Sequence, residues 1–245
     1  MQKILASCHS LEKLSLDRVN LKPVTMFQGL KGSLVNLTPS MIKSICMQNG
    51  QTLQALRLDD CKGIDLRCIQ QIFEKCTKLE ELLLKLPYDC ESSKSVLNYL
   101  AQNLPTSVKK LDLGRNEISD EHLDILIPRC THLKSLALLY CREISSRSVT
   151  TIINHLKHSL EELDLNICKD VVTLEKLLEL NSMTKLNLLI CSYQFTEDEM
   201  IILKKNLPQV KKVKHKWGLD IAEPKFGFWH TDVKKCEVFQ KNKSY

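Results

Sequence analysis

The most chemically versatile side chains in this 245-residue chain are eleven cysteines and seven histidines. A structural zinc site needs four such ligands, which usually arrive as closely spaced pairs such as C-x2-C. The nearest approaches include Cys130 with His132 and His155 with His158, and neither is a pair of cysteines at this spacing with a matching second pair. We therefore predict no metal site and no cofactor.

Catalytic motifs are missing from the sequence as well. It contains no G-x-S-x-G, no H-E-x-x-H and no glycine-rich phosphate loop, and no cysteine lies in a nucleophile signature. Two acidic pairs, Glu80 with Glu81 and Glu161 with Glu162, are reminiscent of glycosidase carboxylates. Each pair straddles the start of a predicted strand, so that one member faces solvent. We interpret them as a solvated surface and predict that the chain is not an enzyme.

Composition and charge indicate a globular protein. Hydrophobic residues make up 43% and charged residues 26%, with only 7 Gly and 7 Pro. No apolar run approaches the roughly 18 residues of a membrane helix, and the start lacks a signal-peptide core. The odd number of cysteines, without an export signal, favours reduced thiols. We predict a cytoplasmic or nuclear protein that does not bind membranes.

The elements that must position any functional side chain are repeated units. Each begins with Leu-x-x-Leu-x-Leu-x-x-(Cys or Asn), and the spacing lies in the roughly 20 to 29 residues of a leucine-rich repeat. Full matches begin at Leu53, Val108, Leu133, Leu160 and Met183, looser ones at Leu11 and Leu79, and a marginal eighth at Val210.

The gap between Leu14 and Leu56 is too long for one repeat and too short for two. We predict a single repeat with an insertion around Met26 to Leu37. A helix should follow, capped by Thr38 with Pro39 at its first position.

The second half of each unit has helical spacing and a capping residue, such as Asp65, Ser119, or Thr196 with Glu199 three residues later. A strand with one helix cannot bury its apolar face alone, so neighbouring units must stack. The sequence predicts an α/β fold, a right-handed leucine-rich-repeat solenoid or horseshoe, with a concave parallel sheet and convex helices. The solenoid should span residues 1–213, in seven or eight repeats with an irregular insertion near 20–50.

Most cysteines fall at two repeat positions, after the strand or three residues before its first leucine. Cys141 and Cys168 are examples of the first, and Cys76 and Cys130 of the second. A buried thiol is a small hydrophobe with a weak S–H donor, which suits a tight turn beside backbone carbonyls.

The segments at 53–76 (LQALRLDDCKGIDLRCIQQIFEKC) and 133–153 (LKSLALLYCREISSRSVTTII) resemble the cysteine-containing leucine-rich repeat. That repeat is typical of F-box/leucine-rich-repeat proteins, the substrate receptors of SCF ubiquitin ligases, and the arrangement of the last repeats and the tail is similar to that family as well. The resemblance covers roughly residues 4 to 213. The chain begins inside a repeat and has no F-box, so a Skp-type adaptor and a cullin are expected as partners only if an F-box lies outside this chain. We also expect the edge of the first strand to be exposed unless another segment completes it.

Alternation along a strand sends the residues before, between and after the two strand leucines to the concave side. Apolar residues that cluster at such positions usually mark a surface that contacts a partner. Nearby carboxylates favour a basic ligand with an apolar anchor. The predicted partner-binding residues on this side are Arg57, Leu83, Lys85, Asp112, Ala137, Leu139, Glu162, Asp164, Asn187 and Leu189.

Residues 214–245 have a different composition, poor in leucine and rich in aromatic side chains. A disordered tail should be poor in aromatics, so this segment is expected to pack on something. It either caps the last repeat or runs back along the concave side. Its predicted partner-binding residues are Trp217, Phe226, Phe228 and Trp229.

Two functions fit these observations. The first is a protein-binding substrate-recognition subunit, or a fragment of one, in an SCF-type ubiquitin ligase. The second is a scaffold or inhibitor that masks a partner without any ligase. The lysine-rich segment KKVKHK (211–216) resembles a nuclear-import signal or an anion patch. Nucleic acid is not the expected partner, because the concave side is mixed in charge.

Overall fold

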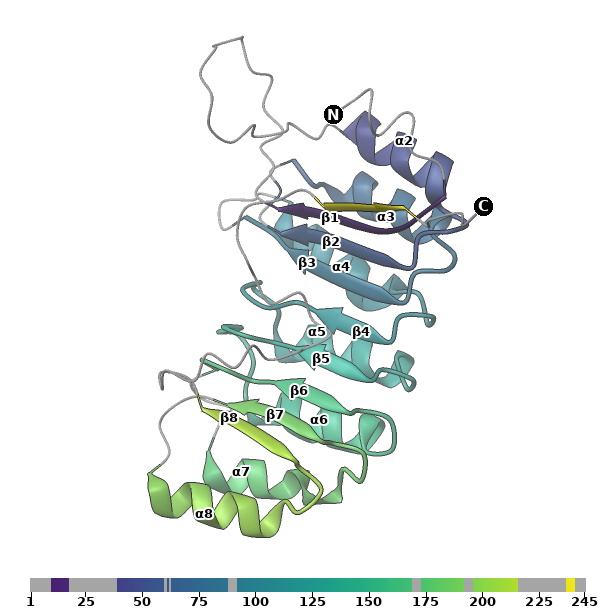
Figure 1. Ribbon diagram of the computed structural model, residues 1–245. Helices are drawn as coiled ribbons and strands as arrows, with labels where there is room; N and C mark the ends of the chain where they lie inside the picture. Colours follow the sequence, from purple (N-terminus) through teal and green to yellow (C-terminus); the bar gives the residue numbers. More distant parts are fainter. Residues whose placement is uncertain are drawn as a thin grey trace, which may run out of the picture. The chain divides into compact units, whose positions relative to one another are not determined.

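The computed structural model describes residues 10–17, 39–59, 61, 63–87, 92–168, 173–191, 196–215 and 237–240. Strands and helices alternate along the chain (Figure 1). The chain divides into two compact units, residues 1–107 with 231–245, and residues 108–230. Each is described here by itself.

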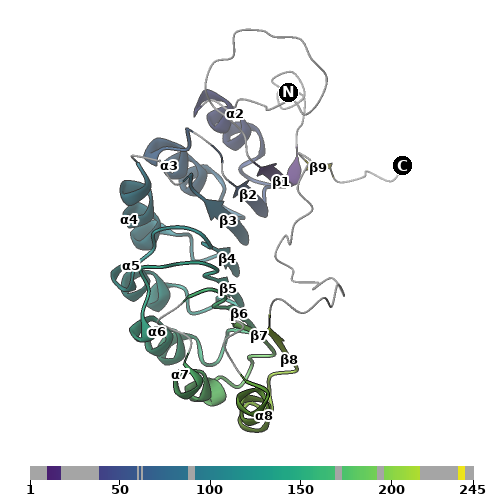
Figure 2. The ribbon, with the colours of Figure 1, turned by 90° about the vertical axis from the view of Figure 1, so that its left-hand side faces the viewer.

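The first unit contains three parallel strands and one antiparallel strand. Its elements are β1 (Leu11–Asp17), α2 (Pro39–Asn49), β2 (Ala55–Asp59), α3 (Leu66–Lys75), β3 (Glu81–Lys85), α4 (Ser93–Asn103) and β9 (Glu237–Gln240). Leu14 pairs with Leu56, and Leu56 with Leu82, so the repeat leucines align. The helices lie on one side of these strands (Figure 2). The N-cap of α3 is Asp65, as predicted, and its carboxylate accepts the Cys68 N–H at 2.8 Å.

Direct pairing of β1 with β2 resolves the long gap in the repeat pattern. Only one helix, α2, lies between these two strands in the described residues, and it begins at Pro39 as predicted. The gap therefore holds a single repeat. The predicted insertion at 26–37 and the cap Thr38 lie outside the described residues.

The edge of β1 that faces away from β2 is covered by β9, so another segment completes the first strand, which is one of the two outcomes that the sequence predicts. β9 runs antiparallel to β1, and Leu14 lies opposite Val238. A segment near the end of the sequence thus supplies backbone partners to the first strand, which removes an unpaired edge. The sequence predicts that the solenoid ends at residue 213. That position falls inside a strand, because β8 spans Lys212–His215.

The second unit contains five parallel strands in sequence order. Its elements are β4 (Lys110–Asp112), α5 (Asp120–Leu126), the 3-10 turn Ile127–Arg129, β5 (Ser135–Ala137), α6 (Ser146–Leu156), β6 (Glu162–Asp164), α7 (Leu174–Leu178), the 3-10 turn Glu179–Ser182, β7 (Leu188–Cys191), α8 (Glu197–Asn206) and β8. Again the helices lie on one side of the strands (Figure 2). The predicted capping box forms at α8, where Thr196 N–H donates to Glu199 and Glu199 N–H donates to Thr196.

The register of β7 differs from the predicted one by three residues. Leu163 pairs with Leu189, whereas the repeat pattern aligned Leu163 with Leu186. Leu189 and Cys191 are therefore fully buried on the helix side, and Met183 ends the preceding turn where Cys130 does in an earlier repeat. Both alignments place leucines in the core, and the run Leu188–Cys191 is apolar at every position, so alternation could not decide between them.

The turn cysteines donate to backbone carbonyls, as predicted, and the acceptors lie in the preceding repeat. Cys168 Sγ donates to the Leu138 carbonyl at 3.0 Å and Cys141 Sγ donates to the Leu113 carbonyl at 3.4 Å. Burial raises the pKa of Cys168 to about 12. Each of these thiols therefore bonds as a neutral donor to the preceding repeat. None of the eight cysteines in the described part of the chain forms a disulfide.

A histidine takes part in the capping of the N-terminus of α5. The Ser119 N–H donates to His122 Nδ1 at 3.1 Å. His122 Nε2 is buried, and it has no hydrogen-bond partner among the described residues. Burial lowers the pKa of His122, although Glu121 opposes the shift. The folded state therefore favours the neutral imidazole.

Stability should consequently fall as pH drops below about 6.5, the ordinary pKa of histidine, and level off below the lowered pKa of the folded protein. His122→Gln keeps a side-chain acceptor for Ser119 but cannot titrate. We expect a smaller loss of unfolding free energy between pH 7 and pH 5 for this variant than for the wild type, measured by urea denaturation. If the variant and the wild type show the same pH dependence, the loss of stability does not come from His122.

Candidate protein-binding face

The face of the strands opposite the helices carries the predicted binding residues, and it is called the open face below. In the first unit, Arg57 pairs with Leu83 and Asp59 with Lys85 along β2 and β3. Arg57 lies 2.9 Å from the Asp59 carboxylate and Lys85 lies 3.8 Å from it. One carboxylate thus offsets part of the charge of both cations. The predicted positions of Arg57, Leu83 and Lys85 on this face agree with the register.

The open face of the second unit centres on an apolar cluster. Ala137, Leu188 and Ile190 have exposed fractions of only 4%, 8% and 6%. They come from β5 and β7. In the intervening strand, Glu162 pairs with Leu188 and Asp164 pairs with Ile190. The cluster therefore lies directly beside two carboxylates.

Two aspartates on this face are held in place by their own turns. Asp112 Oδ1 accepts the Gly114 N–H at 2.8 Å, and Asp164 Oδ1 accepts the Asn166 N–H at 2.9 Å. Gly114 leaves room for this bond, because a Cβ here would lie only 3.1 Å from both Asp112 Oδ1 and the Leu139 carbonyl oxygen. These bonds fix the carboxylates on either side of Ala137, which pairs with both Asp112 and Asp164.

Most sequence-predicted residues of the second unit lie on this face. The register places Asp112, Ala137, Glu162 and Asp164 there, and half-buried Leu139 follows β5. Two placements are wrong because of the register of β7. Leu189 lies in the core, and Asn187 lies before the strand, where its N–H donates to the Glu161 carbonyl at 2.9 Å.

Leu188, Ile190 and Asn166 were missed by the sequence-based prediction. The sequence predicts that Asn187 and Leu189 lie on the open face of β7. In the structure, Leu188 and Ile190 occupy those positions. Asn166 Oδ1 is buried and lacks a hydrogen-bond partner in the described part of the chain, which no sequence signal indicated. An unsatisfied acceptor beside Asp164 suits a ligand that donates hydrogen bonds.

Trp217, Phe226, Phe228 and Trp229 lie outside the described residues. Within the residues that are described, no group of three or more His, Cys, Asp or Glu side chains could hold a metal ion. No helix in the same residues is both long and apolar enough to cross a membrane. The prediction that the chain is not an enzyme stays a prediction.

Comparison with family models gave no match. Among solved structures, a chain in the crystal structure of the Rad7 and Elc1 complex in yeast is similar at a TM-score of 0.52 with 15% sequence identity, over 76% of this chain. A leucine-rich-repeat protein of Leptospira interrogans matches at a TM-score of 0.43 with 15% identity, over 71% of this chain. This chain spans 57% and 56% of the lengths of those two chains. The parallel strands with their repeat leucines in register, the helices on one side of them and the similarity to the yeast structure confirm the predicted α/β leucine-rich-repeat fold.

Proposed function

We propose that this chain is a protein-recognition module that binds a cationic segment with an apolar anchor on the open face of its second unit. One observation carries the proposal: Ala137, Leu188 and Ile190 form an apolar cluster flanked by the fixed carboxylates Asp112 and Asp164. Apolar anchors within a charged rim are the usual anatomy of protein recognition.

The cellular role that fits best is substrate recognition in an SCF-type ubiquitin ligase. The support is the resemblance of the repeats to F-box/leucine-rich-repeat receptors. The similar yeast structure is also one of a two-protein complex. A Skp-type adaptor and a cullin belong to this role only if an F-box exists outside this chain. The second candidate is a scaffold that masks its partner without a ligase, and the same open face serves it equally well.

The aromatic side chains of residues 214–245 are part of the same proposal. The helices lie on the other side of the strands, yet the apolar cluster is nearly inaccessible to water. A partner must therefore displace a cover to reach it. We propose that Trp217, Phe226, Phe228 and Trp229 provide that cover and compete with the partner. The alternative remains that the segment serves only as a cap.

Affinity purification followed by quantitative mass spectrometry tests the proposal. Asp112→Asn with Asp164→Asn removes both charges but keeps an oxygen that accepts the backbone N–H groups. We expect the main protein partners to be depleted at least about tenfold, because each charged contact contributes about 1.5–3 kcal/mol. Substitution of the four aromatic residues by serine should enrich the same partners if the segment is a cover, and should unfold the chain if it is a cap.

The matched control is Glu117→Gln with Glu175→Gln, which removes two exposed charges elsewhere in the second unit. If the Asp112→Asn and Asp164→Asn variant recovers its partners as well as the wild type does, the open face is not the binding surface. A Skp-type adaptor and a cullin among the proteins bound by the full-length gene product would favour the ligase role, and their absence would favour the scaffold.

A further inference from the structure

A second surface of the second unit is formed by the loops that precede its strands. The Lys134 N–H donates to the Lys109 carbonyl, and the Glu161 N–H donates to the Lys134 carbonyl, both at 2.7 Å. The Asn187 N–H continues this ladder to Glu161 at 2.9 Å. Neighbouring strand entries therefore lie side by side, about 4.8 Å apart, and these loops form a row along one edge of the unit.

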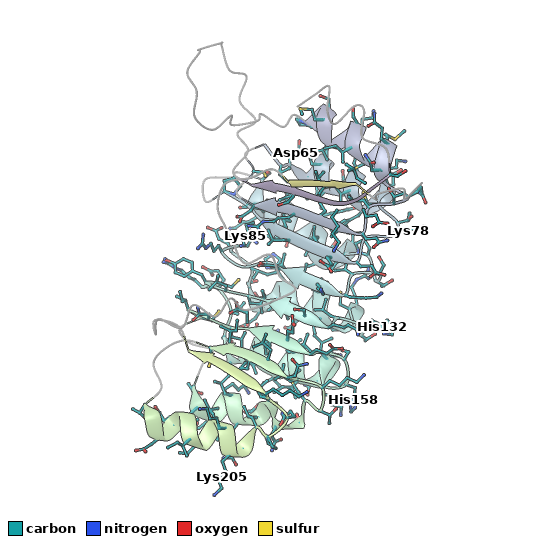
Figure 3. The ribbon with its side chains drawn as sticks, in the orientation of Figure 1. Asp65, Lys78, Lys85, His132, His158 and Lys205 are labelled. Carbon is teal, nitrogen blue, oxygen red and sulfur yellow. The ribbon has the colours of Figure 1, made fainter. Side chains whose placement is uncertain are left out.

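Basic side chains dominate this row. His132 and His158 project from the same side of the unit (Figure 3). The residues are all exposed and come from four consecutive loops. They are called the basic edge, which consists of His132, Lys134, Lys157, His158, Lys185 and Lys211.

Only one carboxylate interrupts the basic edge. Across residues 130–134, 157–161, 183–187 and 207–211, all of them described, Glu161 is the single acidic residue. It pairs with Lys134 at 3.0 Å, and the two side chains are 39% and 53% exposed. In the described part of the chain, no carboxylate pairs with Lys157, Lys185 or Lys211. Like charges held along one line attract an anionic ligand and repel cations.

The chemistry of the row favours a polypeptide over a nucleic acid. The four loops contain no Phe, Tyr or Trp on which a base would stack, and no Arg to grip a phosphate with two bonds. Glu161 would repel one phosphate of an evenly charged strand, whereas a peptide can place an uncharged residue opposite it. We propose that the basic edge binds an extended acidic protein segment rich in Asp and Glu. This site is separate from the open face and does not depend on the function proposed for that face.

Fluorescence anisotropy of a labelled oligo-glutamate peptide at low salt tests this site. Lys134→Glu, Lys185→Glu and Lys211→Glu together should weaken binding at least about tenfold, since three attractive contacts become repulsive. The matched control reverses three exposed charges on helices of the first unit, through Lys43→Glu, Arg67→Glu and Lys94→Glu. It should change affinity by less than about twofold. Equal losses in the two triple variants would overturn the site.

Glu161→Gln should strengthen the binding of oligo-glutamate, and a misfolded variant would not give that result. It removes the only carboxylate of the row and releases Lys134, while the backbone ladder stays intact. We expect about two- to threefold tighter binding of oligo-glutamate. Unchanged or weaker binding would overturn the proposal. So would tighter binding of a single-stranded oligonucleotide with the same number of charges, because the partner class would then be nucleic acid.

Discussion

Gly50→Ala is expected to destabilise the first unit by about 3 kcal/mol, because there is no room for a Cβ at this position. A Cβ would come within 2.5 Å of the Cys46 carbonyl oxygen and would also clash with the Lys75 carbonyl oxygen. Both obstacles are backbone atoms at the ends of α2 and α3, so neither can rotate away. The Gly50 N–H also donates to the Cys46 carbonyl at 2.9 Å.

Urea denaturation followed by circular dichroism measures this loss. Gln48→Ala is the matched control, because Gln48 is exposed on α2 and alanine favours a helix. Its stability should be unchanged or slightly higher. A Gly50→Ala protein with the unfolding midpoint of the wild type would show that the two helix ends can separate at little cost.

Asp120→Ala is expected to cost about 2–4 kcal/mol in the second unit, because one carboxylate joins two repeats. Asp120 lies in the first turn of α5. It accepts the Ser145 N–H at 2.9 Å, the Ser145 hydroxyl at 2.6 Å, and the hydroxyl of Ser148 in α6. Ser148 is fully buried, so alanine at position 120 leaves its hydroxyl without that acceptor.

The same network predicts a dependence on acid. Burial pushes the pKa of Asp120 upward, but the hydrogen bonds from Ser145 and Ser148 outweigh it, and the pKa is lowered. The contribution of Asp120 is therefore complete above the ordinary aspartate pKa of about 3.9 and is lost as pH falls through the lowered value. Asp120→Ala should narrow the difference in unfolding free energy between pH 6 and pH 3. Glu117→Ala, at an exposed position, should leave that difference unchanged.

Repetition made the local structure predictable. The leucines that recur at strand positions identified the strands, and Asp65 and Thr196 identified helix starts. The register of β7 was not predictable, because Leu188 to Cys191 are apolar on both faces and offer two alignments that bury leucine equally well. Only the hydrogen bonds between strands distinguish them.

Features that depend on neighbouring repeats were also missed. The bond from Ser145 to Asp120 joins residues one repeat apart, and neither residue is unusual in its own segment. The basic edge draws on residues from four loops, so no continuous run of basic residues in the sequence marks it apart from KKVKHK, which begins at Lys211. Likewise, no local pattern in Glu237–Gln240 indicates that this segment pairs with β1.

The pairing of β9 with β1 has a consequence for biosynthesis. These two strands are separated by nearly the whole chain, and closing so long a loop is slow and entropically costly. On the ribosome, the edge of β1 that pairs with β9 stays unpaired until β9 has emerged. Chaperones that bind unpaired β-strand edges are therefore expected to associate with the nascent chain until β9 has emerged and paired with β1.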